Sequence, residues 1–282
     1  MTTDTDTGPD TGADPATGPQ AAHEAAGHAA ESAGQPGDSQ LKTRRRVQAV
    51  DMARGAALAA MAVYHFSWDL SFYGLADIPV TSATGWIIFA RMIAGSFLAL
   101  VGVSLVLASR GGINWQAYGR RLAQVVVAAA VITIATWFAF PDAFIFFGIL
   151  HAVALFSLLA LAFLRLPVVV TLACAALAFA APSLVSDPLF DQPKLLWTGL
   201  GTVFPPSNDY VPLFPWFGTT LAGLALGKIT ENAGLWERLS SWRTDTAPAR
   251  LASFAGRHSL IVYLAHQPIL LALLGAVAWA VR

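Results

Sequence analysis

Residues 51–69 read DMARGAALAAMAVYHFSWD, an apolar segment that carries Asp51, Arg54, His65 and Asp69. A helix turns by about 100° per residue, so these four side chains fall within an arc of about 60°. Because a helix rises by about 1.5 Å per residue, they form a stripe about 27 Å long, close to the hydrocarbon thickness of a bilayer. We therefore expect this segment to cross a membrane with one polar face turned away from lipid.

The composition of the whole chain is that of a membrane protein. Hydrophobic residues make up 56% and charged residues 12% of its 282 residues, and the mean hydropathy is +0.58. Soluble proteins carry roughly a quarter charged residues. Residues 1–40 differ from the rest, because they hold seven acids, no Lys or Arg, and many Gly, Pro, Ala and Thr residues. We predict a disordered acidic tail over residues 1–43 and a transmembrane domain over residues 44–282.

A membrane-spanning helix takes about 20 mostly apolar residues, because every backbone polar group must be bonded within the helix. Segments of this kind predict an all-α, polytopic membrane bundle of about seven transmembrane helices: 49–69, 86–108, 119–139, 144–164, 167–184, 212–229 and 259–281. Two connections are long. We expect the loop 185–211 to form an interfacial segment or a lid, and the loop 230–257, with Trp236 and Trp242, to lie on an anionic lipid surface.

Charge in the connecting loops predicts the orientation. Basic residues gather in alternate connections: Lys42, Arg44, Arg45, Arg46, Arg110, Arg120, Arg121, Arg165, Lys228, Arg238, Arg243, Arg250 and Arg257. The other connections are mainly acidic. Because basic loops stay on the cytoplasmic side, the N-terminus is expected in the cytoplasm and the C-terminus outside the cell membrane.

The ends of the polar stripe predict two different roles. Asp51 and Arg54, three residues apart at the inner end, form either an ordinary ion pair or a binding group for a phosphate-bearing donor, to which an arginine is suited. His65 and Asp69, four residues apart near the outer end, have the spacing of a carboxylate that orients an imidazole for proton transfer. The alternative for His65 is a histidine satisfied at the membrane interface.

Further polar residues in other segments are candidate companions of the stripe. Arg91 is expected at about the depth of His65, and His151 lies about a third of the way into its segment from the outer side. His266 shares a helical face with Tyr263 and Ser259. Any one of these histidines could instead be a packing residue bonded to a backbone carbonyl.

Several chemistries have no support in the sequence. The histidines are spread over different depths, and there is no HExxH motif or paired cysteine, so no metal site is predicted. The nucleotide-binding pattern GxxxxGK[ST] and the nucleophile elbow GxSxG are also absent. Nothing indicates nucleic-acid recognition. What remains is a histidine with a carboxylate in a membrane helix, together with arginines toward both ends.

Five segments resemble a known family. They are RVQAVDMARGAALAAMAVYHFSWDLSFYG, WIIFARMIAGSFLALVGVSL, FFGILHAVAL, DYVPLFPWFGTTLAGLALGK and GRHSLIVYLAHQP. Together they resemble the bacterial branch of the heparan-α-glucosaminide N-acetyltransferase catalytic-domain family, over about residues 44–276. That family resembles in turn the integral-membrane O-acyltransferases of bacterial surface glycans, whose arginine–histidine spacing is matched by Arg54 and His65.

The resemblance implies an enzyme that takes an acetyl or other acyl group from cytoplasmic acyl-CoA to a hydroxyl or amine of an extracytoplasmic glycan or glycolipid. It implies that Arg54, with Asp51 beside it, serves the CoA phosphates. His65 would be the general base or a transient acyl acceptor, and Asp69 its orienting carboxylate. The substrate pocket would include Arg91, His151, His266 and Tyr263.

The chain departs from the animal enzyme, which is longer, has an extended outer domain and carries its proposed catalytic histidine in an outer segment. N- or O-acylation therefore stays open, as do direct transfer and an acyl-histidine intermediate. Two other functions are also open. A proton-coupled transporter or flippase would use the same histidines and carboxylates to relay protons, and a non-catalytic membrane subunit would use the tail and the loop 230–257 for partners.

Overall fold

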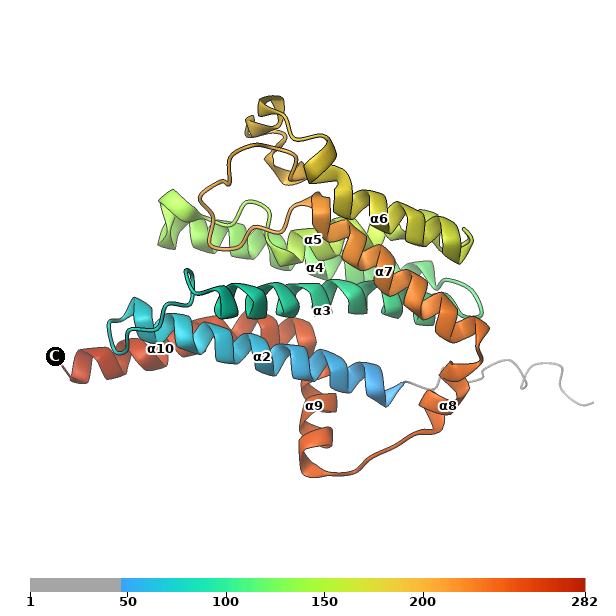
Figure 1. The fold of residues 1–282 in the computed structure, drawn as a ribbon. Coiled ribbons are helices and arrows are strands. Elements are labelled where there is room, and N and C mark those ends of the chain that lie inside the picture. The colour runs from blue at the N-terminus through green and yellow to red at the C-terminus, as the bar shows by residue number, and fades with distance from the viewer. Residues whose placement is uncertain (1–46, 282) are drawn as a thin grey trace, which may run out of the picture. The chain divides into compact units, whose positions relative to one another are not determined.

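The computed structural model describes residues 47–281, which form helices joined by loops, with no strand among them (Figure 1). The long helices are α2 (Gln48–Phe72), α3 (Thr84–Ser109), α4 (Trp115–Ala139), α5 (Ile149–Ala160), α6 (Val168–Leu184), α7 (Leu213–Asn232) and α10 (Ser259–Ala280). The shorter ones are α8 (Leu235–Ser241), α9 (Ala247–Arg257) and the 3-10 turns η1 (Pro141–Ala143), η2 (Leu161–Phe163), η3 (Pro188–Asp191) and η4 (Leu196–Thr198). The predicted tail, residues 1–43, lies outside the described residues, as do residues 44–46 and Arg282 of the predicted domain 44–282.

The all-helical class is confirmed, and each predicted apolar segment coincides with one of the long helices. The largest difference is at α5, which begins at Ile149 and not near residue 144, because residues 144–148 form a loop. Within the described chain, α3, α4 and α10 are long and apolar enough to cross a membrane, and α5 with η2 and α6 are shorter apolar helices. The full number of seven spans stays a prediction.

Helix α7 packs along α3 on one side and α6 on the other (Figure 1). Glycines make the contact with α3 close, because a Cβ at Gly223 would lie 2.1 Å from the carbonyl oxygen of Ala99, and one at Gly102 would lie 2.2 Å from that of Thr220. Small residues of this kind let membrane helices approach backbone to backbone. The resulting core includes Leu98, Leu221 and Leu224.

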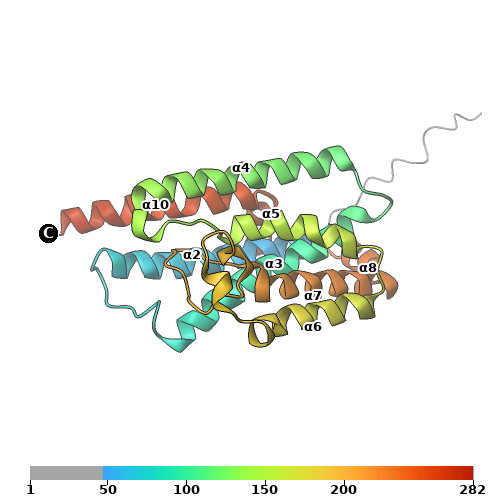
Figure 2. The ribbon, with the colours of Figure 1, turned by 90° about the horizontal axis from the view of Figure 1, so that it is seen from above.

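Helix α2 packs against α9, α10 and α3. Its contact with α9 also depends on glycines, since a Cβ at Gly256 would lie 1.8 Å from the carbonyl oxygen of Asp51, and one at Gly55 would lie 2.0 Å from that of Ala252. Helices α2 and α10 run side by side in the same direction (Figure 1). Helix α4 flanks α10 as well, as seen from above (Figure 2), so α10 lies between α2 and α4.

Basic residues and their partners join the helix ends at one end of the bundle. Arg110, at the end of α3, forms a 2.7 Å ion pair with Glu231 and a second ion pair with Glu237. Lys228 Nζ donates hydrogen bonds of 2.5 and 2.8 Å to backbone carbonyls within residues 163–166, between α5 and α6. These bonds connect the ends of α3, α5, α6 and α7.

The segment between α7 and α10 differs from the expectation of a surface-lying loop. Trp236 is only 4% exposed, and its indole N–H donates a 3.1 Å hydrogen bond to the carbonyl of Gly227. It packs with Val47, Val50 and Val103, so it is an anchor in the bundle and not a lipid-surface residue. Trp242 is 46% exposed, in keeping with the surface position expected for it.

The opposite end of the bundle holds the two loops before α5 and α7. The backbone N–H of Asn208 donates to the carbonyl of Ala143 at 2.9 Å, and that of Val211 donates to the carbonyl of Phe147 at 3.0 Å. The loop 185–211 is thus bonded to the chain that leads into α5. Its interfacial or lid role stays a prediction.

Candidate active site

The contact between α2 and α10 carries polar side chains over three successive levels, which we call the α2–α10 seam. The rings of His65 and His266 lie with their centroids 5.0 Å apart. Farther along both helices, Gln267 Nε2 donates a 2.7 Å hydrogen bond to Asp69 Oδ1. Beyond these, the Tyr73 hydroxyl donates at 2.9 Å to the carbonyl of Leu271. The pairs advance along both helices in the same direction, which defines a parallel packing.

Asp69 is the most enclosed member of the seam, with 0% of the residue exposed. The sequence predicts that it orients His65, but the structure pairs it with Gln267. Among the described residues, the ring contacts of His65 are with Tyr64, at 5.6 Å between centroids, and with His266. The expected carboxylate–imidazole pair is therefore replaced by a histidine–histidine contact followed by a carboxylate–amide pair.

The hydrogen bond of His266 determines its tautomer. Nδ1 lies 2.6 Å from the backbone carbonyl of Tyr263, and a carbonyl can only accept, so Nδ1 carries the proton. In the neutral ring Nε2 then holds a lone pair. Nε2 is buried and has no partner among the described residues. His266 therefore presents an unused proton-accepting nitrogen within the seam.

His151 has the opposite tautomer and no unused nitrogen. The N–H of Gly148 donates to its Nδ1 at 3.3 Å, so Nδ1 holds the lone pair. The Thr133 hydroxyl donates to the carbonyl of Ile145 at 2.8 Å and therefore accepts from His151 Nε2–H at 3.2 Å. These bonds make His151 a capping residue for the start of α5. Its partners are a backbone N–H and a hydroxyl, and not the backbone carbonyl of the packing alternative.

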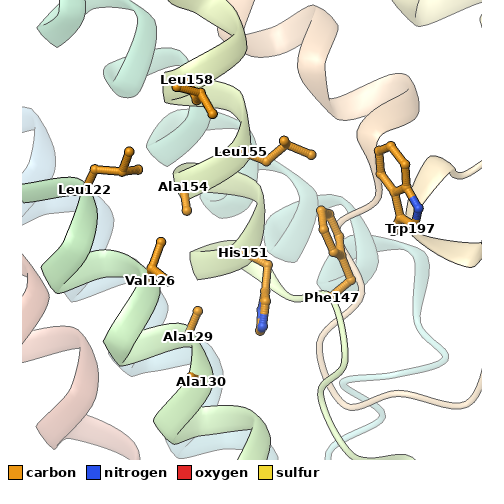
Figure 3. A pocket seen from close by; sticks show the side chains of 10 residues that line it. All are labelled: Leu122, Val126, Ala129, Ala130, Phe147, His151, Ala154, Leu155, Leu158 and Trp197. Atoms are coloured by element: carbon orange, nitrogen blue, oxygen red, sulfur yellow. The ribbon is translucent and has the colours of Figure 1, made fainter. Parts of the chain in front are cut away.

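A cavity of about 520 Å³ lies between α4 and α5 and includes His151 on its wall (Figure 3). Its other walls are apolar side chains of both helices, with Phe147 and Trp197 at one side. His151 thus borders a space, but it offers that space no free donor or acceptor. The cavity is separate from the α2–α10 seam, because none of its lining residues belongs to α2 or α10.

Asp209 is a residue that the sequence did not single out for a site. Its Oδ2 accepts a 2.7 Å hydrogen bond from the N–H of Ile149 at the start of α5, and a Cβ at Gly148 would lie 2.3 Å from the same oxygen. Burial raises the pKa of Asp209 to about 6, against the lowering effect of the Ile149 bond. The Tyr263 ring of α10 lies 5.7 Å from that of His266 between centroids and packs against the core clusters that include Ile149 and Leu150, so Tyr263 lies between the seam and the start of α5.

Arg54 and Asp51 form the expected ion pair, 2.9 Å between Nη1 and Oδ1, with 16% and 13% of their side chains exposed. Arg54 Nη2 also donates a 2.5 Å hydrogen bond to the Ser104 hydroxyl of α3. Ser104 is a second residue that the sequence did not single out. The stripe on α2 therefore meets two neighbours, α3 near Arg54 and α10 near His65.

Arg91 does not belong to either group. It is exposed on α3, and no ion pair is described for it in residues 47–281. The structure therefore brings together His65, Asp69, His266 and Tyr263, holds Asp51 and Arg54 as a separate pair, and leaves Arg91 and His151 apart. Within the described residues, no group of three or more His, Cys, Asp or Glu side chains could hold a metal ion.

Comparison with curated proteins and with solved structures gave no match. A family model did match. The model described as heparan-alpha-glucosaminide N-acetyltransferase, catalytic, matches residues 46–268, which include His65, Asp69, His266 and Gln267. This match confirms the family seen in the sequence and agrees with the apolar helices of a membrane protein. The chain belongs to the heparan-alpha-glucosaminide N-acetyltransferase catalytic family.

Proposed function

We propose that this protein is an integral-membrane acyltransferase that moves an acetyl or other acyl group from cytoplasmic acyl-CoA to a hydroxyl or amine of an extracytoplasmic glycan or glycolipid. The family supports a membrane acetyltransferase-like function. The observation that carries the proposal is the contact of His65 with His266 between two helices that are otherwise mainly apolar. Ionisable groups inside membrane helices are unfavourable and tend to be retained for function.

The proposed topology has seven spans in the cell membrane, with the N-terminus in the cytoplasm and the C-terminus outside. The basic connections support it, because Arg110 and Lys228 bond to their partners at one end of the bundle. The parallel packing of α2 and α10 also supports it, since the first and last of seven spans run in the same direction. Residues 44–282 form the transferase domain in this proposal, and residues 1–43 a separate tail.

In the proposed reaction Arg54 and Asp51 serve the donor, and the seam serves transfer. The ion pair and the bond to Ser104 hold the guanidinium in place at the basic end of α2, where an arginine can recognise CoA phosphates. From Arg54 to His65 the helix rises about 16 Å. The long arm of CoA would have to cover that distance to bring its thioester to His65.

Acyl transfer by purified protein in liposomes tests the proposal. Radiolabelled acetyl-CoA would be supplied with a cell-envelope glycolipid extract, and release of CoA and labelled product would be measured. We expect the His65→Ala variant to lose transfer and the Arg54→Ala variant to bind acetyl-CoA more weakly. His258→Gln is the control, because His258 is exposed at the junction of α9 and α10.

Two results would overturn the proposal. One is a wild-type protein that neither binds acetyl-CoA nor releases CoA with the extract present. The other is a His65→Ala variant that transfers as fast as the wild type. If acetyl-CoA binding is absent and purified protein instead takes up protons when the extract is added, the polar groups serve a transporter or flippase.

A further inference from the structure

Three buried side-chain atoms of the α2–α10 seam have no hydrogen-bond partner among the described residues. They are Asp69 Oδ2, His266 Nε2 and Gln267 Oε1. Buried polar groups are nearly always bonded to protein, water or ligand, because leaving one unsatisfied costs about 1–3 kcal/mol. Three such atoms on neighbouring side chains indicate a place where a bound group completes the bonding.

All three atoms are hydrogen-bond acceptors. The proton of His266 is on Nδ1, so Nε2 offers a lone pair. Gln267 directs its amide N–H toward Asp69 Oδ1, which leaves the Gln267 oxygen as the unused end of the amide. Asp69 has already used Oδ1 as an acceptor, and the second oxygen of the carboxylate accepts as well. The seam therefore lacks donors, and a group with O–H or N–H bonds would complement it.

His65 is not the missing hydrogen-bond partner of His266. Its ring lies 5.0 Å from that of His266 between centroids, tilted by 59°, and no hydrogen bond joins the two within the described chain. The lone pair of His266 is therefore available to a bound group and not committed to its neighbour. His65 and His266 can consequently act on two different reactants.

We infer that the seam binds the hydroxyl or amine of the acyl acceptor and that His266 Nε2 is its general base. The inference rests on the proposed function. Asp69 Oδ2 and Gln267 Oε1 accept hydrogen bonds from the substrate that receives the acyl group. A vicinal sugar diol or an amino sugar can supply the two or more O–H or N–H donors that these bonds need. His266 and Gln267 thus select for donor-rich polar groups, and the tautomer of His266 fixes which nitrogen receives the proton.

In the transfer step the acceptor oxygen or nitrogen attacks the carbonyl carbon of the acyl thioester and forms the new C–O or C–N bond. The C–S bond of the thioester breaks, and CoA leaves as the thiolate. The proton of the attacking O–H or N–H moves to His266 Nε2, while Nδ1–H stays bonded to the carbonyl of Tyr263. His266 then returns a proton to the thiolate or to water.

Two substitutions at His266 separate binding from proton transfer. His266→Gln places an amide oxygen or nitrogen near the position of Nε2 but cannot act as a base, whereas His266→Asn is shorter and can keep only the bond to Tyr263. We expect His266→Gln to lower kcat by about 10²–10⁴-fold with little change in the acceptor KM. We expect His266→Asn to lower kcat similarly and to raise the acceptor KM. Gln267→Leu should raise the acceptor KM by about 5–10-fold with kcat nearly kept.

The assay uses acetyl-CoA as donor and either D-glucosamine or methyl α-D-glucopyranoside as acceptor probe, with the glycolipid extract as a third acceptor. Acetyl-CoA affinity and the thermal unfolding midpoint are measured for every variant, and His258→Gln is the matched histidine control. Unchanged acetyl-CoA affinity with lost transfer in His266→Gln supports the inference. The low-pH limb of kcat/KM, which reports a base in the free enzyme, should also disappear in that variant.

The outcomes distinguish the inference from the function on which it rests. A wild-type protein without CoA release from any acceptor overturns the proposed function. An active wild type with a His266→Gln variant that keeps more than half of its kcat overturns only the role of His266. If His266→Gln does not fold, Gln267→Leu decides, since an unchanged acceptor KM in a folded Gln267→Leu protein contradicts binding at the seam.

Discussion

The imidazole rings of His65 and His266 lie with their centroids 5.0 Å apart across the contact of α2 with α10. The two residues are far apart in the sequence, and each sits on a helix that is otherwise mainly apolar. The carboxylate nearest in sequence to His65, Asp69, bonds to the residue that follows His266. The functional unit indicated by the structure is therefore formed by two helices and is not complete on α2.

His266 and His151 should show opposite tautomers. We expect ¹⁵N NMR of histidine-labelled protein in liposomes to give a protonated Nδ1 and a bare Nε2 for His266, because its Nδ1 faces a carbonyl. For His151 we expect a bare Nδ1 and a protonated Nε2. Spectra of the His266→Gln and His151→Gln proteins assign the signals. The same tautomer at both positions would contradict the hydrogen bonds described above.

The contact of α3 with α7 should not tolerate a side chain at Gly223. A Cβ there would lie 2.1 Å from the carbonyl oxygen of Ala99, so Gly223→Ala must separate the two helices and is expected to destabilise the protein by about 1–3 kcal/mol. Thermal unfolding in detergent measures the effect. The control is Gly85→Ala near the start of α3, where a Cβ has no atom within 4 Å. Equal midpoints for the two variants would be inconsistent with this packing.

Asp209 should make the folded protein less stable as the pH rises through about 6. Its pKa is raised to about 6 in the folded protein from an ordinary value of 3.8, so the folded state binds the proton more tightly than the unfolded state. Below about pH 4 both states are protonated, and as the pH rises through 6 the folded state loses this advantage. The full difference is at most about 3 kcal/mol.

The Asp209→Asn variant tests this effect. We expect it to match the wild type near pH 4 and to be more stable than the wild type above pH 6, where the wild type must bury a charge. Thermal unfolding midpoints measured from pH 4 to pH 8 check the difference. Asp142→Asn is the control, because Asp142 is exposed in η1. A difference that grows toward low pH would have the wrong sign.

The proposed orientation predicts which loops a reagent outside the cell can reach. Single cysteines would be introduced at Asp77, between α2 and α3, and at Gln116, in the first turn of α4, in a Cys174→Ala background; both positions are exposed. A membrane-impermeant maleimide applied to intact cells should label Asp77→Cys, and should label Gln116→Cys only after the membrane is opened. The reverse pattern would invert the topology, and equal labelling would mean that α3 does not cross the membrane.

The sequence predicts the helices well because their signal is local. Long apolar runs between charged or turn-forming residues set the positions of α2, α3, α4 and α10. The start of α5 is missed because residues 144–148 are as apolar as the helix itself, and only the bonds of Gly148 and Asp209 to the first turn show where helix begins. Trp236 is misplaced for a related reason, since its burial depends on the end of α7.

The site is less predictable because its contacts are between helices. The spacing of His65 and Asp69 suggests a pair on one helix, and that suggestion fails once α10 supplies Gln267 as a better-placed partner. A single glutamine in the stretch HQP has no periodic or motif signal of its own. The tautomers of His151 and His266 likewise follow from bonds to backbone groups that no residue pattern encodes.

The junction of α9 with α10 sets the rotation of the last helix. Helix α9 is fixed to α2 where Gly256 meets the carbonyl of Asp51, and only His258 separates α9 from α10. Insertion of one residue within the first turn of α10 would turn the rest of that helix by about 100° relative to its start. His266 and Gln267 would then leave the face of His65 and Asp69, although every side chain would still be present. The number of residues between Gly256 and His266 thus determines whether His266 faces His65.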